Sequence, residues 1–205
     1  MTLTDCWPDA LLVSPPNASQ TETAPEIGVV DWEFASIGRG LNGDLAQLLG
    51  QFAMMECAAD CNADAVRGQQ LAALVSAISD TYRQVSAEEG SVWTAGGGNP
   101  GADRFAALDP NGHRAKLLRS AFLMHGIEIM HWALVKPWNC QNPACMVGPS
   151  HTTAKHECMM VQSMVRRAIW HLRHAKEDEH EFCSPENCIA LQQAYADGQW
   201  LLNLF

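Results

Sequence analysis

The spacing of apolar residues changes from strand-like to helical near residue 44. Before that point, two short apolar runs at residues 10–13 and 27–30 flank a loop rich in Pro, Ser and Thr. Two such runs joined by a loop are typical of a β-hairpin. After it, apolar side chains recur at the three- and four-residue spacing of a helix face, within residues 45–52, 71–82, 117–130 and 160–172.

The intervening segments complete the predicted architecture. Residues 88–112 are rich in Gly without a periodic pattern, which indicates a long loop. A last helix is expected at about 185–203. The sequence therefore predicts a mainly α protein of the α+β class, with one short β-hairpin followed by about five helices.

Composition excludes several classes of function. Of 205 residues, 47% are hydrophobic and 18% charged, which is typical of a globular protein. No apolar run approaches the roughly 18–20 residues of a membrane span, and no basic-then-apolar leader opens the chain. We therefore expect a cytoplasmic protein without a membrane partner. The formal net charge of -10 argues against nucleic acid as a partner, because binding phosphates requires clustered Lys and Arg.

The eight cysteines have two interpretations. Without a secretion signal, reduced thiols are favoured over disulfides. One Cys/His cluster has the spacing C-x4-C-x5-H-x4-H-x-C and consists of Cys140, Cys145, His151, His156 and Cys158. Zinc sites need four converging nitrogen or sulfur ligands, usually with tighter spacing. Ordinary loop thiols and helix-cap histidines are the favoured reading, and a zinc site is the alternative.

Three segments of the first quarter carry a recognisable succession of motifs. They read D-C-W-P-D-A-L-L-V at residues 5–13, V-V-D-W-E-F-A at 29–35 and G-D-L-A-Q-L-L at 43–49. In this order, with a hairpin between the first two, the chain resembles the aminoglycoside phosphotransferase/choline kinase-like family, and its fungal-type branch in particular. The resemblance implies the C-terminal lobe of a protein kinase-like fold.

The resemblance also implies a chemistry, ATP-dependent phosphoryl transfer to a hydroxyl of a small molecule. Such catalysis depends mainly on positioning and charge neutralisation. By resemblance, Asp5 is the catalytic carboxylate that orients the attacking hydroxyl. Asp31 binds the Mg²⁺ that bridges the phosphates of ATP, and Glu33 lies near that metal. Asp44 is structural and ties its helix to the catalytic loop, although it also suits a plain first-turn acid.

Departures from the family pattern indicate a truncated, inactive member. Leu3 and Thr4 occupy the places of the family's His-Gly, and Ala10 replaces an Asn that binds metal. The sequence contains no Gly-rich phosphate loop between a strand and a helix, and the N-terminal lobe that carries it is expected to be missing.

The resemblance continues loosely through Arg119–Gly126 and Trp132, so that residues 1–176 are expected to form the kinase-like lobe. Residues 177–205 are expected to form a C-terminal helical extension. A different class of function is a non-catalytic binding or interaction protein derived from that lobe, associating through exposed apolar surface. A zinc-stabilised version of this protein is less favoured.

Overall fold

The computed structural model describes residue 8 and residues 11–13, 27–29, 41–88, 109–145, 158–193 and 195–204. Within these residues the chain is mainly α-helical, as the periodicity predicts. No helix in this part of the chain is long and apolar enough to cross a bilayer. Most of the predicted loop at 88–112 lies outside the described residues.

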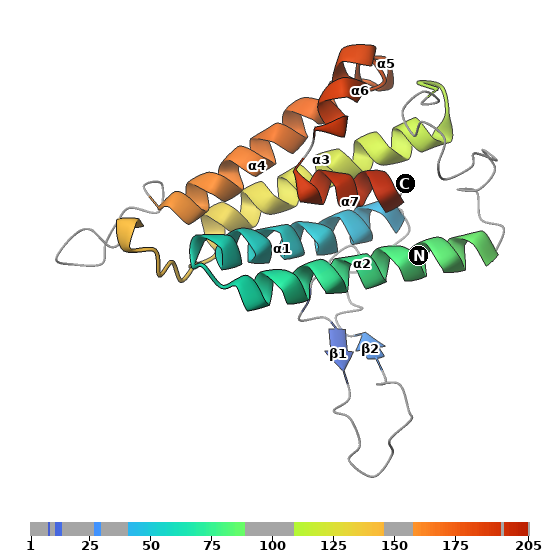
Figure 1. Ribbon diagram of the computed structural model, residues 1–205. Helices are drawn as coiled ribbons and strands as arrows, with labels where there is room; N and C mark the ends of the chain where they lie inside the picture. Colours follow the sequence, from blue (N-terminus) through green and yellow to red (C-terminus); the bar gives the residue numbers. More distant parts are fainter. Residues whose placement is uncertain are drawn as a thin grey trace, which may run out of the picture.

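The predicted hairpin is confirmed. Strand β1 (Leu11–Val13) pairs with β2 (Ile27–Val29) in antiparallel register, and Leu11 lies opposite Val29. The hairpin stands apart from the helices in Figure 1. Because the strands are antiparallel, β1 begins at the same end of the hairpin at which β2 finishes.

Four long helices form the body of the molecule: α1 (Leu41–Cys61), α2 (Ala65–Glu88), α3 (His113–Val135) and α4 (Met159–Ala175). Helix α3 packs against both α1 and α4, and α2 packs against α1 (Figure 1). The short 3-10 helix η3 (Pro143–Cys145) lies between α3 and α4. The predicted helical segments at 45–52, 71–82, 117–130 and 160–172 fall inside these four helices.

The C-terminal region differs from the prediction. Instead of one helix at 185–203, the chain forms α6 (Pro185–Gln192) and α7 (Ala196–Leu204), preceded by the single turn α5 (Glu179–Phe182). The described residues therefore contain seven α-helices rather than about five. The break is stabilised by a tertiary contact, since the side chain of Gln199 in α7 donates a hydrogen bond of 3.3 Å to the carbonyl of Leu191 in α6.

The core consists of two apolar clusters. The larger one brings α1, α2 and α3 together with the C-terminal helices, and Phe122 lies within it against Trp170, His171 and Phe182. The smaller one joins α1, α3 and α4 and contains Met54, Ile129, Met160 and Met164. Helix α7 packs against α1, α2 and α3. The segment predicted as a C-terminal extension thus shares its core with the helices before residue 176.

Candidate functional site

Most of the predicted kinase-like residues lie outside the described residues. Asp5, Asp31 and Glu33 are among them, as is Ala10. Asp44 lies in the first turn of α1 and is half-buried, the place where a carboxylate interacts favourably with the helix dipole. Its predicted role of tying α1 to the catalytic loop stays a prediction.

The hairpin lies between the two predicted acids in sequence. Leu11 opens β1 directly opposite Val29, which closes β2. Asp5 precedes β1 and Asp31 follows β2 along the chain, and the site that they are predicted to form stays a prediction.

A different group of polar side chains meets inside the helical body. His125 of α3, His171 of α4 and Asp197 of α7 are all fully buried. The Nε2 atoms of His125 and His171 lie 2.9 and 2.8 Å from the same carboxylate oxygen, Oδ2 of Asp197. The two rings meet edge to face with centroids 4.6 Å apart. One aspartate thus fastens the last helix to two helices that precede it in sequence.

Hydrogen bonding and burial set the protonation of this group. The Nδ1 atom of His125 lies 3.0 Å from the carbonyl of Ala46, so each nitrogen of this ring faces an oxygen atom. Burial lowers the pKa of His171 to about 4, although Asp197 opposes the shift. Burial alone would raise the pKa of Asp197, but His171 and His125 hold it well below its ordinary range.

Arg167 extends the group toward α1. Its Nη1 atom donates to Oε2 of Glu56 at 2.8 Å and to the carbonyl of Ala53 at 3.2 Å. Its Nε atom lies 3.7 Å from Oδ1 of Asp197. The guanidinium therefore lies between two carboxylates, which offset the free-energy cost of burying its positive charge. Removing one partner of such a buried pair leaves an uncompensated charge and costs about 3–5 kcal/mol.

The arrangement is suited to stabilising the fold rather than to chemistry on a ligand. His125, His171 and Asp197 expose no side-chain surface, and each histidine is hydrogen-bonded directly to Asp197. A general acid or base must come within hydrogen-bond reach of its substrate, and these side chains are enclosed by the bundle. The same three residues have donor atoms close enough for a metal, but each Nε2 already faces the carboxylate oxygen.

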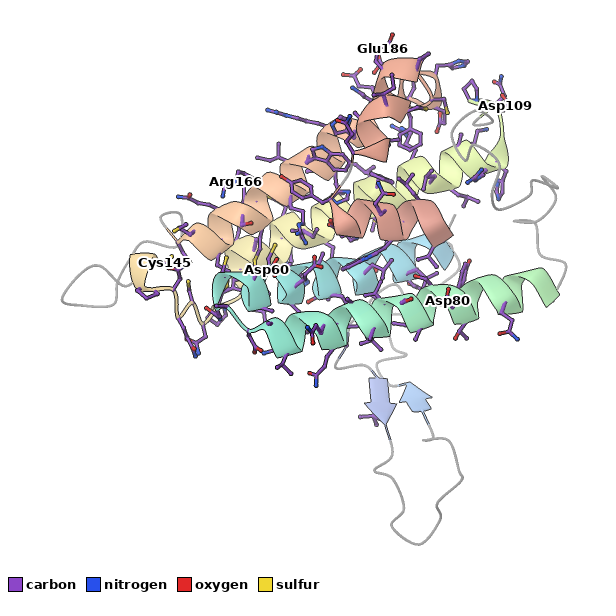
Figure 2. All side chains as sticks on the ribbon, viewed as in Figure 1. Asp60, Asp80, Asp109, Cys145, Arg166 and Glu186 are labelled. Carbon is purple, nitrogen blue, oxygen red and sulfur yellow. The ribbon has the colours of Figure 1, made fainter. Side chains whose placement is uncertain are left out.

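A second group, of sulfur atoms, lies at the end of the bundle. The thiols of Cys140, Cys145 and Cys158 lie within 4.8 Å of one another. These are the three cysteines of the Cys/His cluster found in the sequence. Its two histidines, His151 and His156, lie outside the described residues. Figure 2 shows Cys145 at the same end of the bundle as Asp60, the last residue but one of α1.

The sequence alone did not single out Asp197 or Arg167. Asp197 lies in the first turn of a short apolar helix, where an acid is ordinarily an exposed residue that favours the helix dipole. Its partner His125 is 72 residues away in sequence. No local pattern distinguishes this buried Asp from an exposed one.

Comparison of the chain with protein-family models, with curated proteins and with solved structures finds no match. The residues and their geometry are therefore the basis for the function proposed below.

Proposed function

We propose that this chain is the helical lobe of a small-molecule phosphotransferase of the aminoglycoside phosphotransferase/choline kinase type. The observation that supports this most is the antiparallel hairpin, whose first strand follows Asp5 and whose second strand precedes Asp31 in sequence. Helix α1 then follows with Asp44 in its first turn. The resemblance implies this order along the chain: a catalytic acid, a hairpin, a metal-binding acid and a helix with an Asp in its first turn.

In this proposal the two acids have different roles. Asp5 accepts a hydrogen bond from the attacking hydroxyl and receives its proton. Asp31 binds Mg²⁺, with Glu33 nearby, and the ion neutralises the phosphates of ATP. Mg²⁺ keeps most of its waters, so one or two protein carboxylates suffice to bind it. The methyl side chain of Ala10 cannot bind a second ion, so we expect the metal site to be weak.

The 205-residue polypeptide by itself is expected to lack appreciable kinase activity. Its sequence has no Gly-rich phosphate loop between a strand and a helix, and therefore no recognisable group that fixes ATP in line with the acceptor. Positioning of that kind is worth about 7–11 kcal/mol of the reaction barrier. The proposed carboxylates orient a hydroxyl and a metal ion but leave the phosphate donor unplaced.

A Mn²⁺ titration tests the metal site, because Mn²⁺ favours the same oxygen ligands as Mg²⁺ and its free form is measured by electron paramagnetic resonance. We expect one weak site that Asp31→Asn removes and Mg²⁺ competes for. Asp80→Asn is the matched control, because Asp80 lies exposed on α2. Mn²⁺ binding that is unchanged by Asp31→Asn would overturn the site.

Calorimetry with ATP and Mg²⁺, followed by turnover assays with aminoglycosides, choline and other amino alcohols, tests the expected inactivity. Millimolar or weaker ATP binding without turnover supports it. Micromolar binding with turnover that Asp5→Asn abolishes contradicts it, and would leave an active kinase with a different nucleotide clamp.

A non-catalytic interaction protein is the second candidate, and an apolar stripe on α3 favours it. Leu123, Ile127 and Leu134 share one side of this helix and expose 36%, 46% and 52% of their surface. Their spacing of four and seven residues is that of a coiled-coil seam, which suits self-association of the chain. Sedimentation at rising concentration should then show a dimer that Ile127→Glu disrupts. A strictly monomeric chain would exclude this candidate.

A further inference from the structure

The cysteine group at the end of the bundle draws its members from the stretch that connects α3 to α4. Cys140 follows α3, Cys145 ends η3, and Cys158 directly precedes α4. Their sulfur atoms lie within 4.8 Å of one another. Four thiolates around one Zn²⁺, with bonds of about 2.3 Å, lie about 3.8 Å apart in a tetrahedron. The three sulfurs are therefore already gathered to about the size of a zinc site.

A fourth thiol lies beside this group. Cys61 is the last residue of α1 and packs, with Cys140 and Cys158, against the smaller apolar cluster. Cys61 is outside the 4.8 Å group, so its side chain has to move closer to share a metal ion with the other three.

The backbone around these cysteines is held in place by specific hydrogen bonds. Asn62 follows Cys61, and its side chain brackets Cys140, because Nδ2 donates to the carbonyl of Asn139 at 3.1 Å. Its Oδ1 atom accepts from the backbone N–H of Gln141 at 2.7 Å. The end of α1 and the loop after α3 are thus joined on either side of Cys140.

The sulfur of Cys145 lies where a backbone N–H group can stabilise a thiolate. It accepts a hydrogen bond of 3.2 Å from the backbone N–H of Met159, the first residue of α4. Helix N-termini stabilise thiolates through such N–H groups and the helix dipole. Hydrogen bonds to a ligand atom of this kind orient it and tune its affinity for metal.

We propose that Cys61, Cys140, Cys145 and Cys158 bind one structural Zn²⁺ ion, which fastens the C-terminal end of α1 and the loop after α3 to the N-terminal end of α4. A set of four sulfur ligands selects zinc over the oxygen-favouring ions Mg²⁺, Ca²⁺ and Mn²⁺. With all four positions taken by protein, the site is closed and is suited to stabilising the fold rather than to catalysis. The proposal is independent of the kinase-like function.

The test uses the full chain, expressed with added zinc and purified in a phosphine reductant. Elemental analysis should find one zinc per chain. Exchange for Co²⁺ should give the visible bands of tetrahedral cobalt and the near-ultraviolet absorption of cobalt–thiolate bonds. Cys145→Ser and Cys158→Ser should each weaken zinc binding on the order of a hundredfold or more, because changes outside the ligand set alone cost about 10–100-fold.

Two further variants sharpen the assignment. Cys183→Ser is the matched control, because Cys183 lies between α5 and α6, and it should keep zinc at full affinity. Asn62→Ala removes no ligand but frees the loop around Cys140, so affinity should fall about tenfold. If the ligand variants fail to fold, wild-type protein freed of metal by a chelator gives the same comparison, since Zn²⁺ added back should raise its melting temperature.

Each contrary result has a clear meaning. Wild-type protein that holds no zinc, and whose melting temperature Zn²⁺ does not change, would overturn the site. A disulfide among Cys140, Cys145 and Cys158 in protein purified without reductant, together with no zinc uptake after reduction, would do the same. The brown colour of an iron–sulfur cluster would overturn the choice of metal. Full zinc affinity in Cys61→Ser would remove Cys61 from the ligand set.

Discussion

The substitution Asp197→Asn tests whether the buried histidine–aspartate group holds the last helix in place. It keeps the shape of the side chain but removes its negative charge. The side chain is fully buried and accepts hydrogen bonds of 2.9 and 2.8 Å from His125 and His171. Arg167 also loses one of its two carboxylate partners, which lies 3.7 Å from its Nε atom.

The expected cost follows from these contacts. A hydrogen bond to a charged group contributes about 1.5–3 kcal/mol, and breaking a buried ion pair by removing one partner costs about 3–5 kcal/mol. The two estimates describe the same contacts and are not added. We therefore expect Asp197→Asn to lower the free energy of unfolding by about 3–5 kcal/mol. For a chain of this size, that is roughly 6–20 °C in melting temperature.

Urea unfolding followed by circular dichroism at pH 7 measures this difference. Asp80→Asn makes the same chemical change at an exposed position on α2, where the side chain accepts a 3.4 Å hydrogen bond from Ser76. The control should lie within about 0.5 kcal/mol of wild type. A loss below about 1 kcal/mol for Asp197→Asn, against that control, would refute the idea that the charged group holds α7.

Three further changes probe the same bundle. Because His171 binds a proton near pH 6.5 when unfolded but only near 4 when folded, the unfolded state gains protons first as pH falls through that window, and about 3 kcal/mol of stability should be lost. Urea midpoints measured from pH 7 to pH 4 give the dependence of stability on pH. His171→Gln should make this dependence weaker, even though Asp197 lies nearby, and an unchanged dependence would contradict the assignment to His171. Gly126→Ala would bring a methyl group within 2.9 Å of Leu172 Cγ. The cost of overpacking, about 1–3 kcal/mol, should outweigh the roughly 1 kcal/mol gain in helix propensity and lower the melting temperature. A higher melting temperature would show that α3 and α4 can move apart to accommodate the methyl group. Asn187→Ala removes the side-chain hydrogen bonds to the half-buried carbonyl of His174 at 3.1 Å and the buried carbonyl of Phe182 at 2.8 Å. It should lower the free energy of unfolding by about 2–3 kcal/mol, measured with urea, and a near-neutral result would show that water replaces these hydrogen bonds.

The parts of the fold that were predicted correctly are those that depend on local spacing. The hairpin follows from two apolar runs joined by a turn-rich loop, and the four long helices follow from apolar periodicity alone. The division between α6 and α7 was not predicted, because the contact that stabilises it joins Gln199 to Leu191 across the turn. A pattern read along the chain does not contain that contact.

The candidate sites also differ in whether local sequence reveals them. Cys140, Cys145 and Cys158 were found in the sequence because they lie in one short stretch, and the structure gathers their sulfur atoms. Cys61 was not included in the predicted Cys/His cluster, because its position beside that stretch depends on how α1 ends next to the loop after α3. The buried position of Asp197 depends on the path of the whole C-terminal region, which no short motif specifies.

The two polar groups hold the bundle where its apolar contacts end. The smaller apolar cluster is built largely from Ala, Met and Cys side chains, and at its far end the loop after α3 must turn back into α4. Thiols that converge on one ion would fix that turn. In the interior, α7 is a helix of nine residues, too short to be stable alone. Its single buried carboxylate joins it to α3 and α4, so the last helix depends on electrostatic pairing as well as on its apolar face.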